Sequence, residues 1–285
     1  MEFYHLRSFV VVAKTGNLTL AAKQLFTTPP AISAHIKALE EELQTSLFVR
    51  SSKGMQLTEK GRLLLPKAQN TLDSALSLVN EAADNQHEII GTFKLAINQS
   101  AAQLKIPTLV ANIQENIPGV SIDITSMATG KTLEAIRGNQ IDGGYIYGDI
   151  PEDCFAIKVK MQKITTITNK EFQLTDKTIK QEDWITMGFY CPFDQFLKSK
   201  IGNNIKSVAS SDDEISRLEL VKSGLGLSFY EREEAEFYED KGQIKLLSNL
   251  DFETPLYFVV ANNKVNDPVI KALLQEIKIL WEIKP

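Results

Sequence analysis

Apolar residues recur at helical spacing in three stretches of the first 45 residues. The first stretch predicts a helix that ends near Gly16, and Asn17 or Thr19 is suited to cap a second helix. In the short link that follows, Thr28 is a good N-cap for a third helix, and Pro29 suits its first position. This third helix is predicted to run to about residue 43.

Two short extended segments, 47–50 and 55–57, flank a turn containing Gly54 and predict a hairpin. Two helices joined by a tight turn, the second presenting Ser33 and Lys37, fit the geometry that reads the DNA major groove. Arg50 and Lys53 on the hairpin would then contact phosphates as a wing. The alternative is a plain three-helix domain with a solvated basic loop.

A long helix is predicted from Thr58 to about Gln86. Its apolar residues alternate at three- and four-residue steps, as in a coiled coil, so a dimer is expected. The alternative is a helix packed on its own domain. The residues of this seam are Leu65, Ala68, Leu72, Ala75, Val79 and Ala82.

Beyond this helix the pattern changes to strands alternating with helices, which predicts a parallel sheet. Strands over 93–97, 120–125 and 141–147 alternate with two helices. Ser100 and Thr129 lie in loops that precede these helices, where helix N-termini favour an anionic ligand.

A second lobe is expected over about 162–261, with strands around 164–168, 185–187, 208–210 and 227–230. It carries a helix over 213–221. A strand over 256–261 and a last helix over 268–281 would return to the first lobe, about 89–161 and 262–285. Two crossings between lobes make a hinge over a cleft.

The formal charge of −5 conceals an asymmetry along the chain. Residues 1–67 carry nine basic and five acidic side chains, so the remainder has a net charge of −9. Only the basic head is therefore expected to meet a polyanion. No stretch reaches the about 18 apolar residues of a membrane helix, and two cysteines suit a reduced, cytoplasmic protein. We expect no metal centre, no cofactor and no catalytic motif, and we expect Glu40, Glu41 and Glu42 to be a solvated helix face.

The segments 17–22, 30–33, 39–43, 47–50 and 57–61 together resemble the N-terminal domain of LysR-type transcriptional regulators. The later segments 133–137, 141–144 and 220–227 resemble the family's effector domain, which is like a type 2 periplasmic binding protein. Pro29 stands where the family usually has Gln, and Ala34 where Arg or Lys is frequent, so no sequence preference carries over.

The resemblance implies a winged helix-turn-helix over 1–58, a linker and dimerisation helix over 59–88, and a two-lobed α/β effector domain over 89–285. It implies homodimers that assemble into tetramers on interrupted inverted repeats of double-stranded DNA, and a small-molecule effector between the lobes. The DNA-binding residues are predicted to be Thr19, Thr28, Pro29, Pro30, Ser33, Lys37, Arg50 and Lys53. The effector-binding residues are predicted to be Asn98, Gln99, Ser100, Thr129, Tyr147, Gly188 and Phe189.

Two other functions stay open at this point. One is a cytoplasmic solute-binding or enzymatic α/β protein whose N-terminal helices are structural. The other is an architectural protein that coats DNA, which the acidic body disfavours because wrapping proteins need extended basic surface.

Overall fold

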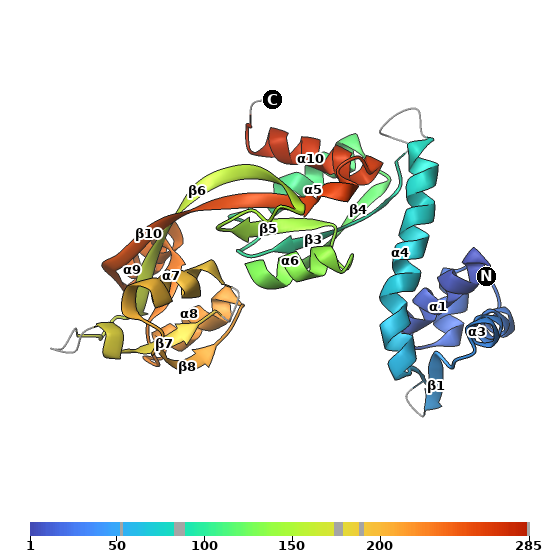
Figure 1. Ribbon diagram of the computed structural model, residues 1–285, viewed down its shortest axis with the longest axis horizontal. Coiled ribbons are helices and arrows are strands. Elements are labelled where there is room, and N and C mark those ends of the chain that lie inside the picture. Colours follow the sequence, from blue (N-terminus) through green and yellow to red (C-terminus); the bar gives the residue numbers. More distant parts are fainter. Residues whose placement is uncertain (52–53, 83–88, 174–178, 188–190, 284–285) are drawn as a thin grey trace. The chain divides into compact units, whose positions relative to one another are not determined.

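The computed structural model describes residues 1–51, 54–82, 89–173, 179–187 and 191–283. The chain divides into two compact units, Met1–Asp84 and Asn85–Pro285. Figure 1 labels the elements of both units along the chain. Each unit has its own hydrophobic core, and each is described separately below.

The first unit opens with three helices, α1 (Phe3–Thr15), α2 (Leu18–Gln24) and α3 (Pro29–Leu43). α1 ends at Gly16, whose φ of 63° is the left-handed conformation that glycine adopts without strain. Asn17, not Thr19, caps α2 by accepting hydrogen bonds from the N–H groups of Thr19 and Leu20. Thr28 caps α3 as predicted, with proline in its first turn. The three predicted helices are therefore confirmed.

The predicted hairpin is present as β1 (Phe48–Ser51) and β2 (Gly54–Leu57), which pair antiparallel. A side chain of α3 fixes the start of β1. The Glu40 carboxylate accepts hydrogen bonds from the N–H groups of Leu47 at 2.6 Å and Phe48 at 3.1 Å. The expectation of a solvated Glu40 is therefore wrong. The sequence pattern placed it beside two exposed glutamates, and nothing in that pattern shows that the chain folds back over it.

The predicted long helix is α4 (Glu59–Glu81), with Thr58 as its cap, and residues 83–88 of the prediction lie outside the described residues. Its N-terminal half packs on its own unit, because Leu65, Ala68 and Leu72 join the core formed by α1, α2 and α3. Further along, Leu78 and Val79 are 75% and 61% exposed. The alternative, a helix packed on its own domain, therefore holds for the first half of α4, and the dimer seam stays a prediction for the second half.

The second unit is built on a mixed six-stranded sheet in the order β4-β3-β5-β10-β6-β9. Its first strands β3 (Gly91–Ile97), β4 (Val120–Ser126) and β5 (Gly143–Tyr147) are parallel, as predicted. The strands β6 (Cys154–Asn169), β9 (Ser228–Glu231) and β10 (Ile244–Ala261) add antiparallel pairs. The sequence predicted only parts of β6 and β10 and so missed how far they extend.

The first lobe has three layers (Figure 1). The helices α5 (Ile106–Asn116) and α10 (Pro268–Leu280) cover one face of the sheet, and α6 (Thr129–Arg137) covers the other.

Among the residues described, no helix is long and apolar enough to cross a membrane.

The second lobe contains β9, the far halves of β6 and β10, and a small parallel sheet of β7 (Asp183–Thr186) and β8 (Lys206–Ser210). Its helices are α7 (Pro192–Ile201), α8 (Glu214–Lys222) and α9 (Arg232–Asp240), with a short 3-10 turn at Ile179–Gln181, and a second 3-10 turn, Asn262–Lys264, follows β10 in the first lobe. α8 was predicted, whereas α7 and α9 were not. One apolar core runs from β3, α5 and α10 of the first lobe to β7, α7 and β9 of the second.

We predict that Glu40→Ala destabilises the first unit by about 2 kcal/mol, because it leaves two backbone N–H groups at the hairpin without their charged acceptor. Denaturant unfolding of the full chain, followed by circular dichroism, measures the effect. Glu41→Ala is the matched control, since the Glu41 carboxylate forms an exposed ion pair with Lys37 and its loss should change stability by less than about 0.5 kcal/mol. Equal stability of the two variants would contradict the prediction.

Candidate functional site

The first candidate site is the outward face of α3. Pro29, Pro30, Ser33 and Lys37 follow helical spacing along it, and all but the half-buried Ser33 are exposed. Lys37 makes an exposed pair with Glu41 at 3.5 Å, one turn further along the helix. Such pairs are weak, so the ammonium group remains available to a phosphate.

The predicted contacts outside α3 are also at the surface where the structure describes them. Thr19 is exposed in the first turn of α2, and Arg50 is exposed on β1. Thr28 is exposed too, and its hydroxyl accepts the N–H of Ala31 at 3.4 Å as the helix cap. Lys53 lies outside the described residues.

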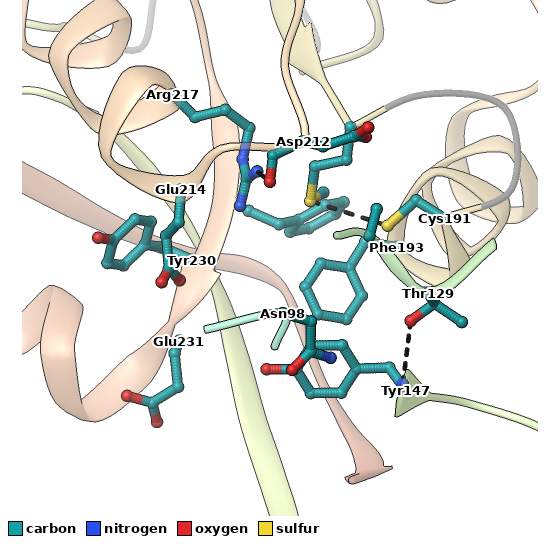
Figure 2. Close-up of a pocket in the computed structure, with 13 residues that line it drawn as sticks. Asn98, Thr129, Tyr147, Cys191, Phe193, Asp212, Glu214, Arg217, Tyr230 and Glu231 are labelled. Atoms are coloured by element: carbon teal, nitrogen blue, oxygen red, sulfur yellow. Dashed lines mark hydrogen bonds between the residues drawn. The ribbon is translucent and has the colours of Figure 1, made fainter. Parts of the chain in front are cut away.

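The second candidate site is a pocket in the second unit, between the ends of the parallel strands and the second lobe (Figure 2). The space between the lining residues is about 430 Å³, a figure that includes the part open to solvent. The residues that line it are Asn98, Ala128, Thr129, Tyr147, Met187, Cys191, Phe193, Asp212, Glu214, Arg217, Phe229, Tyr230 and Glu231.

The first lobe supplies a wall of neutral polar groups at the carboxyl ends of its strands. Tyr147 ends β5, and its N–H donates to the hydroxyl of Thr129 at 3.0 Å, which ties β5 to the start of α6. The amide of Gln99 donates a hydrogen bond to the Tyr147 hydroxyl. Burial, with the nearby carboxylates of Glu214 and Glu231, raises the pKa of Tyr147 well above its usual value. Tyr147 therefore stays a neutral phenol.

The predicted effector residues are only partly brought together. Asn98, Thr129 and Tyr147 line the pocket, whereas Gln99 lies behind Tyr147 and is not part of the lining. Ser100 does not line the pocket either, and its hydroxyl accepts the N–H of Gln103 at 3.4 Å in a local turn. Gly188 and Phe189 lie outside the described residues.

The second lobe supplies a charged and aromatic wall that the sequence analysis missed. Asp212 and Glu214 follow β8, Arg217 lies one turn further along α8, and Glu231 ends β9. The strands before these residues were predicted, so the rule applied to Ser100 and Thr129 would have found them. That rule places ligand-binding groups just after the carboxyl ends of strands.

Burial is the main reason why Glu214 has an unusual acidity. Desolvation and the neighbouring carboxylates of Glu234, Glu231 and Asp213 raise its pKa to about 7, and the Arg217 guanidinium opposes them. Figure 2 shows its carboxylate facing the interior of the pocket, on the side where the Glu231 carboxylate and the Tyr147 hydroxyl lie.

Side chains also tie the two lobes together beside the pocket. Lys131 of α6 forms an ion pair with Asp212. Gln103 of the first lobe donates to Glu231 at 3.4 Å and also to Glu234 of α9. These contacts link the two lobes beside the pocket, whose lining includes Asp212 and Glu231.

Neither cysteine has the surroundings of a reactive thiol. Cys154 and Cys191 are both free and buried. Burial raises the pKa of Cys154, and it raises that of Cys191 to about 11. Among the residues described, no group of His, Cys, Asp and Glu side chains could hold a metal ion.

Comparison with known proteins identifies the family of both units. Residues 3–62 match the profile of the bacterial regulatory helix-turn-helix protein, lysR family, and residues 86–281 match the LysR substrate binding domain. The chain is 28% identical over 244 residues to the HTH-type transcriptional regulator CysL of Bacillus subtilis (strain 168), which covers 81% of each protein. It is 26% identical over 258 residues to the HTH-type transcriptional regulator YofA of Bacillus velezensis, which covers 86% of each.

Solved structures show the same fold. The probable transcriptional regulator PA0477 from Pseudomonas aeruginosa aligns with a TM-score of 0.72 at 18% identity, over 98% of this chain and 96% of that one. Full-length CbnR complexed with its target DNA aligns with a TM-score of 0.62 at 18% identity, over 98% and 99%.

The chain is thus a transcriptional regulator with an N-terminal DNA-binding helix-turn-helix domain and a C-terminal effector-binding domain. It belongs to the LysR family. The family resemblance and the fold class expected from the sequence are confirmed.

We predict that Glu214→Gln stabilises the ligand-free protein by about 3 kcal/mol at pH 8 and by less than about 1 kcal/mol at pH 5. Because folding raises the pKa of Glu214 from 4.5 to about 7, the folded state loses stability as the pH rises through this interval. The amide cannot ionise and avoids that loss. Denaturant midpoints at both pH values measure the difference.

Glu219→Gln on the same helix is the control, because Glu219 is exposed and pairs with Lys222 outside the pocket. If Glu214→Gln had the same effect at pH 5 and pH 8, the carboxylate would not carry the charge that this prediction requires.

Proposed function

We propose that this regulator binds interrupted inverted repeats of double-stranded DNA as a homodimer, with a further assembly to tetramers, under the control of a small molecule in the interlobe pocket. The observation that carries the proposal is the outward face of α3. Ser33 and Lys37 lie on this face, and the opposite face of the same helix is buried. A helix held in this way can enter the major groove.

Each predicted contact has a role that follows from its chemistry. Ser33, Thr28 and Thr19 carry hydroxyl groups suited to base edges or phosphates, and Pro29 and Pro30 offer apolar surface at the start of α3. Lys37, Arg50 and Lys53 would neutralise phosphates and so make the affinity depend on salt. Glu40 has a structural role in this scheme, since it fixes the hairpin that carries Arg50.

Dimerisation through α4 is supported by its exposed apolar residues. Leu78 and Val79 lie in the half of the helix beyond the core of the first unit, and both are mainly exposed. Covering them with a second copy would bury apolar surface and would place two α3 helices on one DNA site.

The interlobe pocket is proposed as the effector site because Asn98, Thr129 and Tyr147 meet the acidic and aromatic wall of the second lobe there. A ligand that prefers one arrangement of the lobes shifts the assembly toward it, which is regulation by binding and needs no turnover. We therefore propose a cytoplasmic, non-enzymatic protein with domains over 1–58, 59–88 and 89–285.

We predict that Lys37→Ala weakens operator binding about tenfold and lowers the slope of log affinity against log salt by about 1, because one phosphate contact is lost. The operator is first selected from random duplexes by the full chain, and fluorescence anisotropy at several salt concentrations then measures the affinity. Lys278→Ala, at an exposed site on α10 in the other unit, is the control. An unchanged salt slope in Lys37→Ala would remove α3 from the DNA interface.

We predict that Val79→Asp weakens the dimer at least tenfold, because a carboxylate would be buried in the proposed apolar contact. Sedimentation velocity over a range of protein concentrations measures the dimer. Asp73→Lys changes the charge by two units at an exposed position turned well away from both Leu78 and Val79 around the helix, so it should leave the dimer intact. A Val79→Asp protein that remains fully dimeric would place the interface elsewhere.

A further inference from the structure

The charges inside the interlobe pocket do not balance. Glu214 and Glu231 face it from the second lobe, with Glu234 close behind them. The cation that faces them is Arg217, because the Lys131 ammonium pairs with Asp212 at the edge of the site. The described side chains therefore leave an excess of negative charge in the pocket.

The groups around the acids do not neutralise them. One nitrogen of the Arg217 guanidinium, Nη1, donates hydrogen bonds to the backbone carbonyls of Ser211 and Asp212, at 3.0 and 3.1 Å. Glu231 accepts neutral donors, the N–H groups of Glu233 and Glu234 and the amide of Gln103. The Arg217 guanidinium lowers the pKa of Glu214, but burial and the neighbouring carboxylates outweigh it.

Two further polar groups of the lining are available to a ligand. Both side-chain polar atoms of Asn98 are buried without a partner among the described residues, in the wall beside Tyr147 (Figure 2). Arg217 is 5% exposed, and its Nε is likewise buried without a partner in the part of the chain that the structure describes. Buried polar atoms in native proteins are normally hydrogen-bonded, so these atoms suit contact with a polar molecule.

The remaining walls are apolar and aromatic. Phe193 lies with its ring centre 4.8 Å from that of Tyr147, and Met187 and Phe229 complete this side. Aromatic faces attract cations and give alkyl chains a surface to pack on. The described residues contain no cluster able to hold a metal ion, so an organic cation fits this pocket better than a metal.

Building on the proposed effector pocket, we propose that its ligand is a small organic ammonium compound, whose charged nitrogen lies against Glu214 and Glu231 and whose carbon chain packs on Phe193. The charge of this ligand is opposite to that of the small anion expected from the helix N-termini alone. Thr129 lies at such a terminus, but its hydroxyl already accepts the N–H of Tyr147, and the carboxylates opposite would repel an anion.

Isothermal titration of the full chain with matched compounds tests this proposal. Putrescine, cadaverine, L-ornithine and L-lysine carry ammonium groups, 1,4-butanediol is a neutral analogue, and succinate and glutarate are dianions. We expect ammonium compounds to bind and the diol and the diacids not to bind. Glu214→Gln should weaken that binding about tenfold or more, whereas Glu219→Gln should leave it unchanged. Glu214 is preferred over Glu231 for the test, because Glu231 also caps α9.

The outcomes separate this proposal from the proposed function. Binding of a diacid that is lost in Thr129→Val but kept in Glu214→Gln would overturn the ammonium ligand and leave the effector pocket in place. Binding of none of these compounds, by a protein that still selects an operator, would also overturn the proposal. A chain that selects no DNA sequence would overturn the proposed function, whichever compound binds.

The pH dependence gives an independent readout. Glu214 must ionise to bind a cation, and with its pKa near 7 the affinity should rise about tenfold from pH 6 to pH 8. Primary alkylammonium groups stay charged over this range. An anion would show the opposite trend, and Glu214→Gln should flatten the profile. The charged and titratable groups around Glu214 are Asp213 and Arg217 on its own helix, Tyr230 and Glu231 of β9, Glu234 of α9 and Tyr147 of β5.

Discussion

The antiparallel pairing of β6 with β10 is the constraint on which the effector domain depends. The two strands pair from Asn169 with Ile244 to Cys154 with Ala261, and so run through both lobes. Tyr147 is held opposite Leu256 of β10, which pairs with Lys160 of β6, and Glu231 is held opposite Ile164 of β6. The two walls of the pocket are thus fixed about four residues, or ~13 Å, apart along one ladder.

This arrangement lets the pocket hold groups that would be costly in an ordinary core. Buried carboxylates without cations disfavour the folded state, and a domain tolerates them where the surrounding apolar packing is extensive. Here the core is continuous between the lobes through residues such as Phe93, Phe258, Phe229 and Trp184. The packing of that core offsets the free-energy cost of the buried charged groups in the pocket, as is common for binding sites.

The sequence predicted most of what is local and little of what depends on distant contacts. Caps and turns identified α1, α2 and α3, because Asn17, Thr28 and Gly16 act on their own neighbours. The full length of β6 and β10 was missed, since two register shifts, after Leu247 and after Leu256, interrupt their pattern. In the site, Thr129 was found from its place after a strand, and Asn98 and Tyr147 were found from the family resemblance, whereas the acids of the second lobe were not found. Their charge balance depends on Arg217 and Lys131, which come from different helices.

The same ladder limits how a ligand can act on the domain. Any movement of one lobe against the other must bend β6 and β10, because both strands run through the two lobes. The register shifts in β10 are the places where a ladder bends most easily. The ties from Lys131 to Asp212 and from Gln103 to Glu231 span the lobes on the pocket side, and Asp212 and Glu231 are themselves part of its lining. A ligand that binds either carboxylate competes with a contact between the lobes. Its binding free energy can therefore shift the equilibrium between different angles of the two lobes.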